Sequence, residues 1–150
     1  MELVFTKRGG KYDDLTIRRA DGSSEQIQCP KQRIIPHDMV HYAVETVMAR
    51  KGFLTRLATG ETAQGKMTVD ALAESTERLV ETIQAEAWSG RVPTEEVLSL
   101  YAIACETWGH PTAPVSADQI DLIREEMDAL TEQWDAIPVN GSMVLRMEPV

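Results

Sequence analysis

The sequence contains few cysteines and no long apolar segment, and each shortage excludes a class of protein. Only Cys29 and Cys105 occur, far apart and in no C-x-x-C arrangement. This argues against a disulfide framework, and we expect a reduced, cytoplasmic setting. No apolar run approaches the roughly 18 residues that a membrane span requires. Near the N-terminus, Lys7 and Arg8 follow a short apolar stretch instead of preceding it, which is the wrong order for a signal peptide. We expect no membrane partner.

Basic residues are also scarce. The chain has 15 Lys and Arg against 24 Asp and Glu, which gives a formal net charge of −9. Nucleic-acid binding needs clustered basic side chains that neutralise phosphates, so we expect no nucleic-acid partner. If the chain binds another protein, as an adaptor would, its acidic surface favours a basic partner.

Complete catalytic motifs are missing as well. No serine stands in a Gly-x-Ser-x-Gly turn, and no nucleophile lies near the paired histidines in the sequence. Residues 60–66 have the outline of a phosphate-binding loop, but Met67 stands where Ser or Thr would contact magnesium. We expect no cofactor, and whether the protein is an enzyme stays open.

The residues that are present predict a single α+β domain over residues 1–150. The hydrophobic content of 43% and the charged content of 26% are typical of a globular chain of this length. Alternating apolar residues predict three short strands around residues 3–5, 15–17 and 27–29, with Asp21-Gly22 as a tight turn. A last strand is predicted over residues 142–148. It cannot stand alone, so we expect it to join the first three in a four-stranded, largely antiparallel sheet with about four helices on one face.

After Pro36 the apolar period changes from two to about 3.6, which predicts helices. The first is expected from near Asp38 to Arg50, and a short helical segment over residues 53–58 is followed by a loop over 59–66. The others are expected from Thr68 to Gly90, from Pro93 to Trp108, and from the capping box Ser116-x-x-Gln119 to a break at Pro138.

The last predicted helix carries a narrow apolar stripe with alternating steps of three and four residues. Such a stripe is the seam of a helix–helix contact. Two interpretations stay open: the seam packs within its own domain, or it forms an interface with a second copy or another partner, with Trp134 as an anchor. The stripe consists of Ile120, Ile123, Met127, Leu130 and Trp134.

The first helix carries the candidate site. His37, His41 and Glu45 recur at every fourth position, which stacks their side chains on one side of a helix, and Asp38 lies beside them. On a helical wheel these residues point away from the apolar side that holds Val40 and its neighbours, with His41 as the intermediate case on its flank.

Four interpretations of this polar face are open, and one of them is a polar pocket or a surface for a partner. Imidazole and carboxylate are ligands of zinc and similar ions, which makes His41 and Glu45 weak metal candidates. Histidine beside carboxylate is also the material of acid–base catalysis. In the plainest interpretation Asp38 caps the helix, His41 is partly buried with one hydrogen bond, and Glu45 is solvated.

The stretch Ile35-Pro36-His37-Asp38-Met39-Val40-His41-Tyr42-Ala43-Val44-Glu45, with Gly52-Phe53 and Leu57-Ala58-Thr59-Gly60 following, resembles a group of small bacterial proteins. These carry a Pro-His-Asp-x-x-His-x-x-Val-Glu helix followed by Gly-Phe and Ala-x-Gly steps. The resemblance covers residues 35–60 and implies a bacterial source. The group has no established activity, so no functional residue is transferred.

Taken together, the patterns favour a small cytoplasmic protein that works by binding and forms a homodimer through helical surfaces. The alternative is a metal-dependent or acid–base enzyme centred on His37, Asp38, His41 and Glu45.

Overall fold

The strands form one antiparallel sheet. A computed structural model describes residues 1–48, 71–109 and 112–147. The sheet has four strands in the order β3-β2-β1-β4. The C-terminal strand joins the first three, as predicted, and the structure shows that its neighbour is the N-terminal strand. The strands are β1 (Glu2–Thr6), β2 (Tyr12–Arg18), β3 (Ser24–Pro30) and β4 (Ser142–Arg146). The predicted α+β class is confirmed.

The strand register places apolar side chains in rows on one face of the sheet. Leu3 lies between Ile17 on one side and Leu145 on the other. All three are buried. They share one face of the sheet, because alternate residues of a strand point to the same side. Their neighbour Val144 points to the opposite face and is half exposed. The buried row therefore marks the face against which the helices pack.

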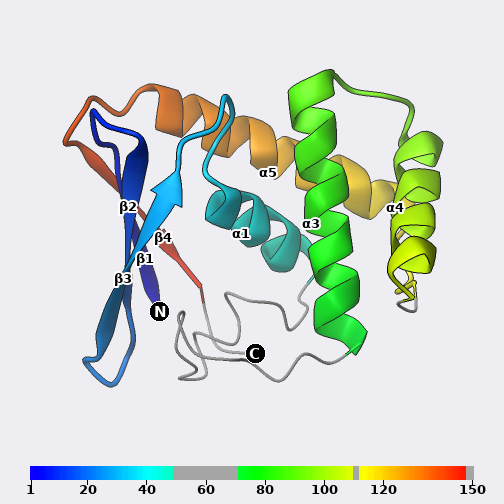
Figure 1. The fold of residues 1–150 in the computed structure, drawn as a ribbon, viewed down its shortest axis with the longest axis horizontal. Helices are drawn as coiled ribbons and strands as arrows, with labels where there is room; N and C mark the ends of the chain where they lie inside the picture. The colour runs from blue at the N-terminus through cyan, green and yellow to red at the C-terminus, as the bar shows by residue number, and fades with distance from the viewer. Residues whose placement is uncertain (49–70, 110–111, 148–150) are drawn as a thin grey trace.

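The helices lie together on that side of the sheet (Figure 1). They are α1 (His37–Met48), α3 (Ala71–Ser89), α4 (Thr94–Trp108) and α5 (Ala117–Asp135). Helix α1 lies between the sheet and α3, and it contacts both α3 and α5, while α4 lies farthest from the sheet. None of the helices in the described residues is long and apolar enough to cross a membrane.

Where the structure can be compared with the predicted helix ends, local capping explains them. The Ser116 hydroxyl accepts from the Gln119 amide, and the Gln119 side chain accepts from the Ser116 amide, which is the predicted capping box. Gly109 ends α4 with φ of +71°, a conformation that glycine adopts without strain. The end predicted at Arg50, the start predicted at Thr68, and the short helix and loop predicted over 53–66 lie outside the described residues.

The apolar seam of α5 faces the interior of its own chain. Each of its residues is at most 6% exposed, so none of them is available for contact with a second chain. The interpretation of this stripe as an interface is therefore wrong, because α1 and α4 pack against α5, and Phe5 of the sheet contacts Trp134 at its end. The seam residues are Ile120, Ile123, Met127, Leu130 and Trp134.

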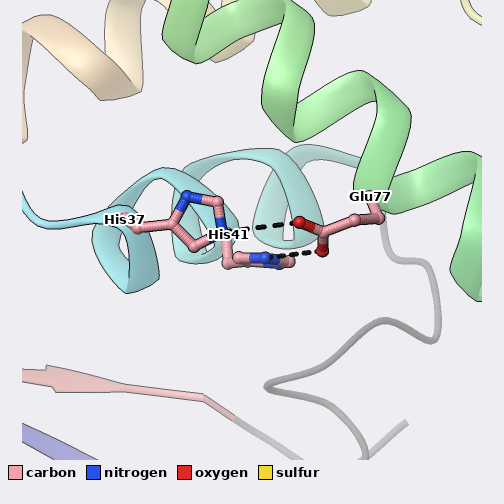
Figure 2. Close-up of side chains that lie close together, drawn as sticks. All are labelled: His37, His41 and Glu77. Carbon is pink, nitrogen blue, oxygen red and sulfur yellow. Dashed lines mark ion pairs between the residues drawn. The ribbon is translucent and has the colours of Figure 1, made fainter. Parts of the chain in front are cut away.

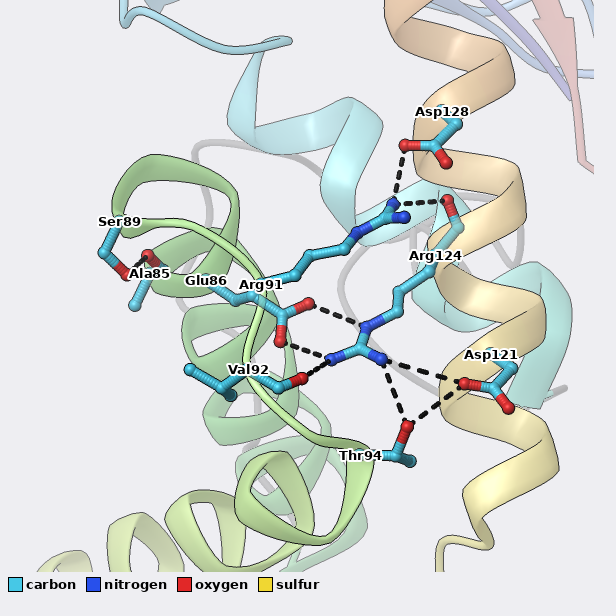
Figure 3. Close-up of polar contacts among 9 residues, drawn as sticks. All are labelled: Ala85, Glu86, Ser89, Arg91, Val92, Thr94, Asp121, Arg124 and Asp128. Carbon is cyan, nitrogen blue, oxygen red and sulfur yellow. Dashed lines mark hydrogen bonds and ion pairs between the residues drawn. The ribbon is translucent and has the colours of Figure 1, made fainter.

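A buried arginine fastens α5 to the end of α3. The Arg124 guanidinium, whose side chain is 13% exposed, donates to both carboxylate oxygens of Glu86 at 2.9 and 2.6 Å. It also donates to the Val92 carbonyl at 2.7 Å and to the Thr94 hydroxyl at 3.1 Å, as Figure 3 shows. Two parallel charge-assisted bonds give a fixed geometry, so this cluster holds the α3–α4 connection against α5. Holding α3 in place matters because α3 supplies part of the candidate site.

Candidate metal site

The two histidines of α1 project together because four residues separate them. The Pro36 carbonyl accepts from the amides of Met39 and Val40 at 2.9 and 3.3 Å, which starts the helix at this point. His37 and His41 then occupy successive turns on the same side. Their rings lie 4.8 Å apart, centre to centre, at an angle of 78°.

A carboxylate from α3 faces both imidazoles. Oε1 of Glu77 lies 3.4 Å from Nε2 of His37, and Oε2 lies 2.9 Å from Nε2 of His41. Figure 2 shows the three side chains converging from the two helices. The same ring nitrogen of each histidine is therefore directed at one carboxylate.

The other ring nitrogens face a second pair of polar side chains. Nδ1 of His41 lies 3.5 Å from Oε2 of Glu45, one turn further along α1. Nδ1 of His37 lies 2.7 Å from the side-chain oxygen of Gln84, which belongs to α3. Each histidine thus has an oxygen at both of its nitrogens.

The side chains at one end of the site are buried, and those at the other end are partly exposed. The side chains of His41 and Glu45 are 3% and 0% exposed, whereas those of His37 and Glu77 are 40% and 33% exposed. His41 and Glu45 therefore lie at the inner end of the cluster, and His37 and Glu77 lie at its open edge.

Without a metal ion, the histidines and carboxylates of the cluster stabilise one another's charged forms. Burial opposes protonation of His41, but the carboxylates of Glu45 and Glu77 outweigh it and raise the pKa of His41 to about 10. Glu77 raises the pKa of His37, and burial and the charge of His41 oppose that rise only in part. The pKa of Glu77 is itself lowered, because the two imidazoles outweigh its burial. A metal ion bound at this place would displace the protons that the imidazoles direct at the Glu77 carboxylate.

The distances fit the ligand set of a divalent transition metal. Ligand atoms about 2.0–2.1 Å from a tetrahedral zinc ion lie roughly 3.3 Å from one another. One ligand atom from each of His37, His41 and Glu77 lies within 4.8 Å of the other two, and the two nitrogen–oxygen distances are 2.9 and 3.4 Å. These two distances are close to the ligand–ligand separation of a tetrahedral zinc site.

The structure brings together three of the four residues that the sequence marked as a polar site. His37, His41 and Glu45 share the cluster, whereas Asp38 points elsewhere and accepts from the Cys29 thiol at 3.5 Å. The interpretation of Glu45 as a solvated residue is wrong, because its residue exposure is 2%. A helical wheel gives a direction only, and α3 packs against the polar side that the wheel set apart from the apolar stripe.

Sequence reasoning missed the two residues of α3. Glu77 and Gln84 lie seven positions apart, a spacing that puts both on one face of a helix. That spacing alone did not single them out, since α3 carries several other polar residues with no partner visible in the sequence. Only the packing of α3 against α1 selects this pair.

Comparison of the chain with protein-family models, with curated proteins and with solved structures found no match in any of the three. The interpretation of the site accordingly depends on its own geometry. The Nε2 atoms of His37 and His41 converge on the carboxylate of Glu77. The Nδ1 atom of each histidine faces a further side-chain oxygen.

Proposed function

We propose that the protein binds a divalent first-row transition-metal ion, such as zinc, through His37, His41 and Glu77. The observation that carries this proposal is that the two Nε2 atoms face the two oxygens of one carboxylate. Imidazole nitrogen combined with carboxylate oxygen suits Zn²⁺, Fe²⁺, Co²⁺ and Ni²⁺ better than Mg²⁺ or Ca²⁺, which prefer oxygen ligands alone.

Three protein ligands favour a catalytic type of site over a structural one. Structural zinc is usually closed by four protein ligands, whereas catalytic zinc keeps a position for water or substrate. His37 and Glu77 lie at the exposed edge of the cluster, so the remaining position would face solvent. The proposal therefore favours the metal-dependent enzyme among the interpretations that the sequence left open.

The same geometry speaks against simple acid–base catalysis by His41. An effective general base has a pKa near the working pH. The pKa of His41 is raised to about 10, so at neutral pH its imidazole is protonated and cannot accept a proton. Its side chain is also only 3% exposed, which keeps it out of reach of a substrate. Metal binding, in contrast to acid–base catalysis by His41, would use both histidines as ligands.

Elemental analysis of untagged protein, together with titration by Zn²⁺ and Co²⁺, tests the proposal. We expect one ion per chain, loss of binding in Glu77→Gln and His37→Ala, and normal binding in Glu81→Gln. Glu81 is the matched control because it is an exposed carboxylate on the next turn of the same helix. Binding that survives in both Glu77→Gln and His37→Ala would place the ion elsewhere.

We also propose, as a separate property, the homodimer that the sequence favoured. The α5 seam does not supply its interface, but α4 carries Leu100 and Ile103 one turn apart, and these side chains are 46% and 58% exposed. Apolar side chains clustered on an outer helix face are typical of a contact surface. Light scattering over a concentration series tests this, and a monomer at the highest concentration would exclude the dimer.

A further inference from the structure

We propose that Glu45 and Gln84 are positioning residues of the metal site, which hold the imidazoles of His41 and His37 with both Nε2 atoms toward the ion. The inference rests on the proposed function and deepens it. In metalloproteins a histidine ligand donates its second ring N–H to a carboxylate, a carbonyl or water, and this partner fixes the tautomer and orientation of the ring.

The partner of His41 is a carboxylate buried beside it. Glu45 lies one turn along α1, its side chain is 0% exposed, and Oε2 lies 3.5 Å from Nδ1 of His41. Taking a carboxylate out of water costs free energy that close polar partners must offset. With the Nδ1–H directed at Glu45, the lone pair of neutral His41 is on Nε2, where Glu77 and the ion would lie.

The partner of His37 is a neutral amide that is itself oriented. Oε1 of Gln84 lies 2.7 Å from Nδ1 of His37. The side-chain nitrogen of Gln32 donates to the same oxygen at 3.5 Å and to the Ile35 carbonyl at 2.7 Å. Because Gln32 presents a donor to Gln84, the Gln84 atom that faces His37 is the oxygen. Neutral His37 therefore carries its proton on Nδ1 and its lone pair on Nε2.

The two partners differ in charge, which makes the inference specific. A carboxylate behind an imidazole makes that ligand more basic than an amide does. Removing the charge at position 45 and adding one at position 84 should therefore change the metal affinity in opposite directions. Neither change alters an atom that would touch the ion.

The experiment measures Co²⁺ affinity by competition with a chelator at fixed pH, together with the visible spectrum of the bound ion. We expect Glu45→Gln to bind about 10–100-fold more weakly, and Gln84→Glu to bind more tightly than the wild type. The Co²⁺ spectrum of both should stay close to that of the wild type, because the three direct ligands are unchanged. Glu81→Gln, which removes an exposed charge from α3, should leave affinity and spectrum unaltered.

Each outcome decides between the two proposals. Failure of the wild-type protein to bind Co²⁺ or Zn²⁺ would overturn both. Normal wild-type binding with Glu45→Gln and Gln84→Glu within about twofold of it would overturn the positioning role alone. If Glu45→Gln does not fold, half-buried Gln84 decides the question: Gln84→Glu should bind more tightly and Gln84→Ala more weakly, and equal affinity of the two refutes the inference.

Discussion

The Nε2 atom of His41 lies 2.9 Å from Oε2 of Glu77, and this contact joins the buried inner side of α1 to α3. It makes a polar cluster part of the packing between two helices. His41 is charged in the metal-free protein, since its pKa is raised to about 10 by Glu45 and Glu77 against the effect of burial. The protonation of this pair therefore influences the stability of the fold.

The metal-free protein should be most stable in mildly acidic solution. A raised histidine pKa stabilises the fold fully below the unfolded value of 6.5, and this stabilisation is lost as the pH rises toward about 10. The lowered pKa of Glu77 stabilises the fold above its unfolded value of 4.5 and is lost as the pH falls. Urea unfolding in EDTA should therefore give a maximum between about pH 5 and 6.5. Glu77→Gln should flatten the decline on both sides, and a maximum above pH 8 in the wild type would contradict the sign.

Metal should stabilise the wild-type protein and leave Glu77→Gln unaffected. An ion present at 100 times its dissociation constant adds about 2.7 kcal/mol to the free energy of unfolding. For a chain of this length that corresponds to a rise in Tm of about 5–10 °C. Differential scanning calorimetry with and without Zn²⁺ measures the shift. Glu81→Gln should show the full rise, and an equal rise in Glu77→Gln would argue against this carboxylate as a ligand.

Arg124 and Arg91 should differ in their contribution to stability although both form ion pairs. Arg124 is 13% exposed and bonds both oxygens of Glu86, so Arg124→Ala leaves a buried carboxylate without its main partner. We expect a loss of about 3 kcal/mol. Arg91 is 51% exposed and pairs with exposed Asp128, so Arg91→Ala should cost less than about 1 kcal/mol. Urea unfolding compares the two, and similar losses would refute the structural role of Arg124.

Both thiols should be protected in the native protein. Cys29 and Cys105 are 4% and 0% exposed. Burial, and after it the carboxylate of Asp38, raises the pKa of Cys29. Reaction with Ellman's reagent at pH 8 should be at least about 100-fold slower than after unfolding in guanidinium. Cys105→Ser isolates the signal of Cys29, and fast labelling of that variant in its native state would contradict the burial.

The sequence predicted the fold well because the fold depends on short-range patterns. Alternation around Leu3 and Ile17 marks strands, the Ser116 capping box marks the start of α5, and both depend on neighbours within a few positions. Adding the last strand to the N-terminal sheet followed from the rule that a lone strand is not stable, whereas its pairing with β1 is seen only in the structure. Each of these inferences needs no knowledge of which helix packs on which.

The site needed that knowledge. The histidine spacing on α1 is local, and the sequence marked His37, His41 and Glu45 correctly as neighbours. It set their side of the helix apart from the apolar stripe but did not show what covers it, because the polarity of one helix cannot reveal a second polar helix packed against it. Glu77 and Gln84 belong to the cluster only because the α5 anchor at Arg124 and the apolar core place α3 across α1. Backbone pattern and helix ends thus follow from chemistry along the chain, whereas the convergence of two imidazoles on one carboxylate depends on the tertiary packing of α1 and α3.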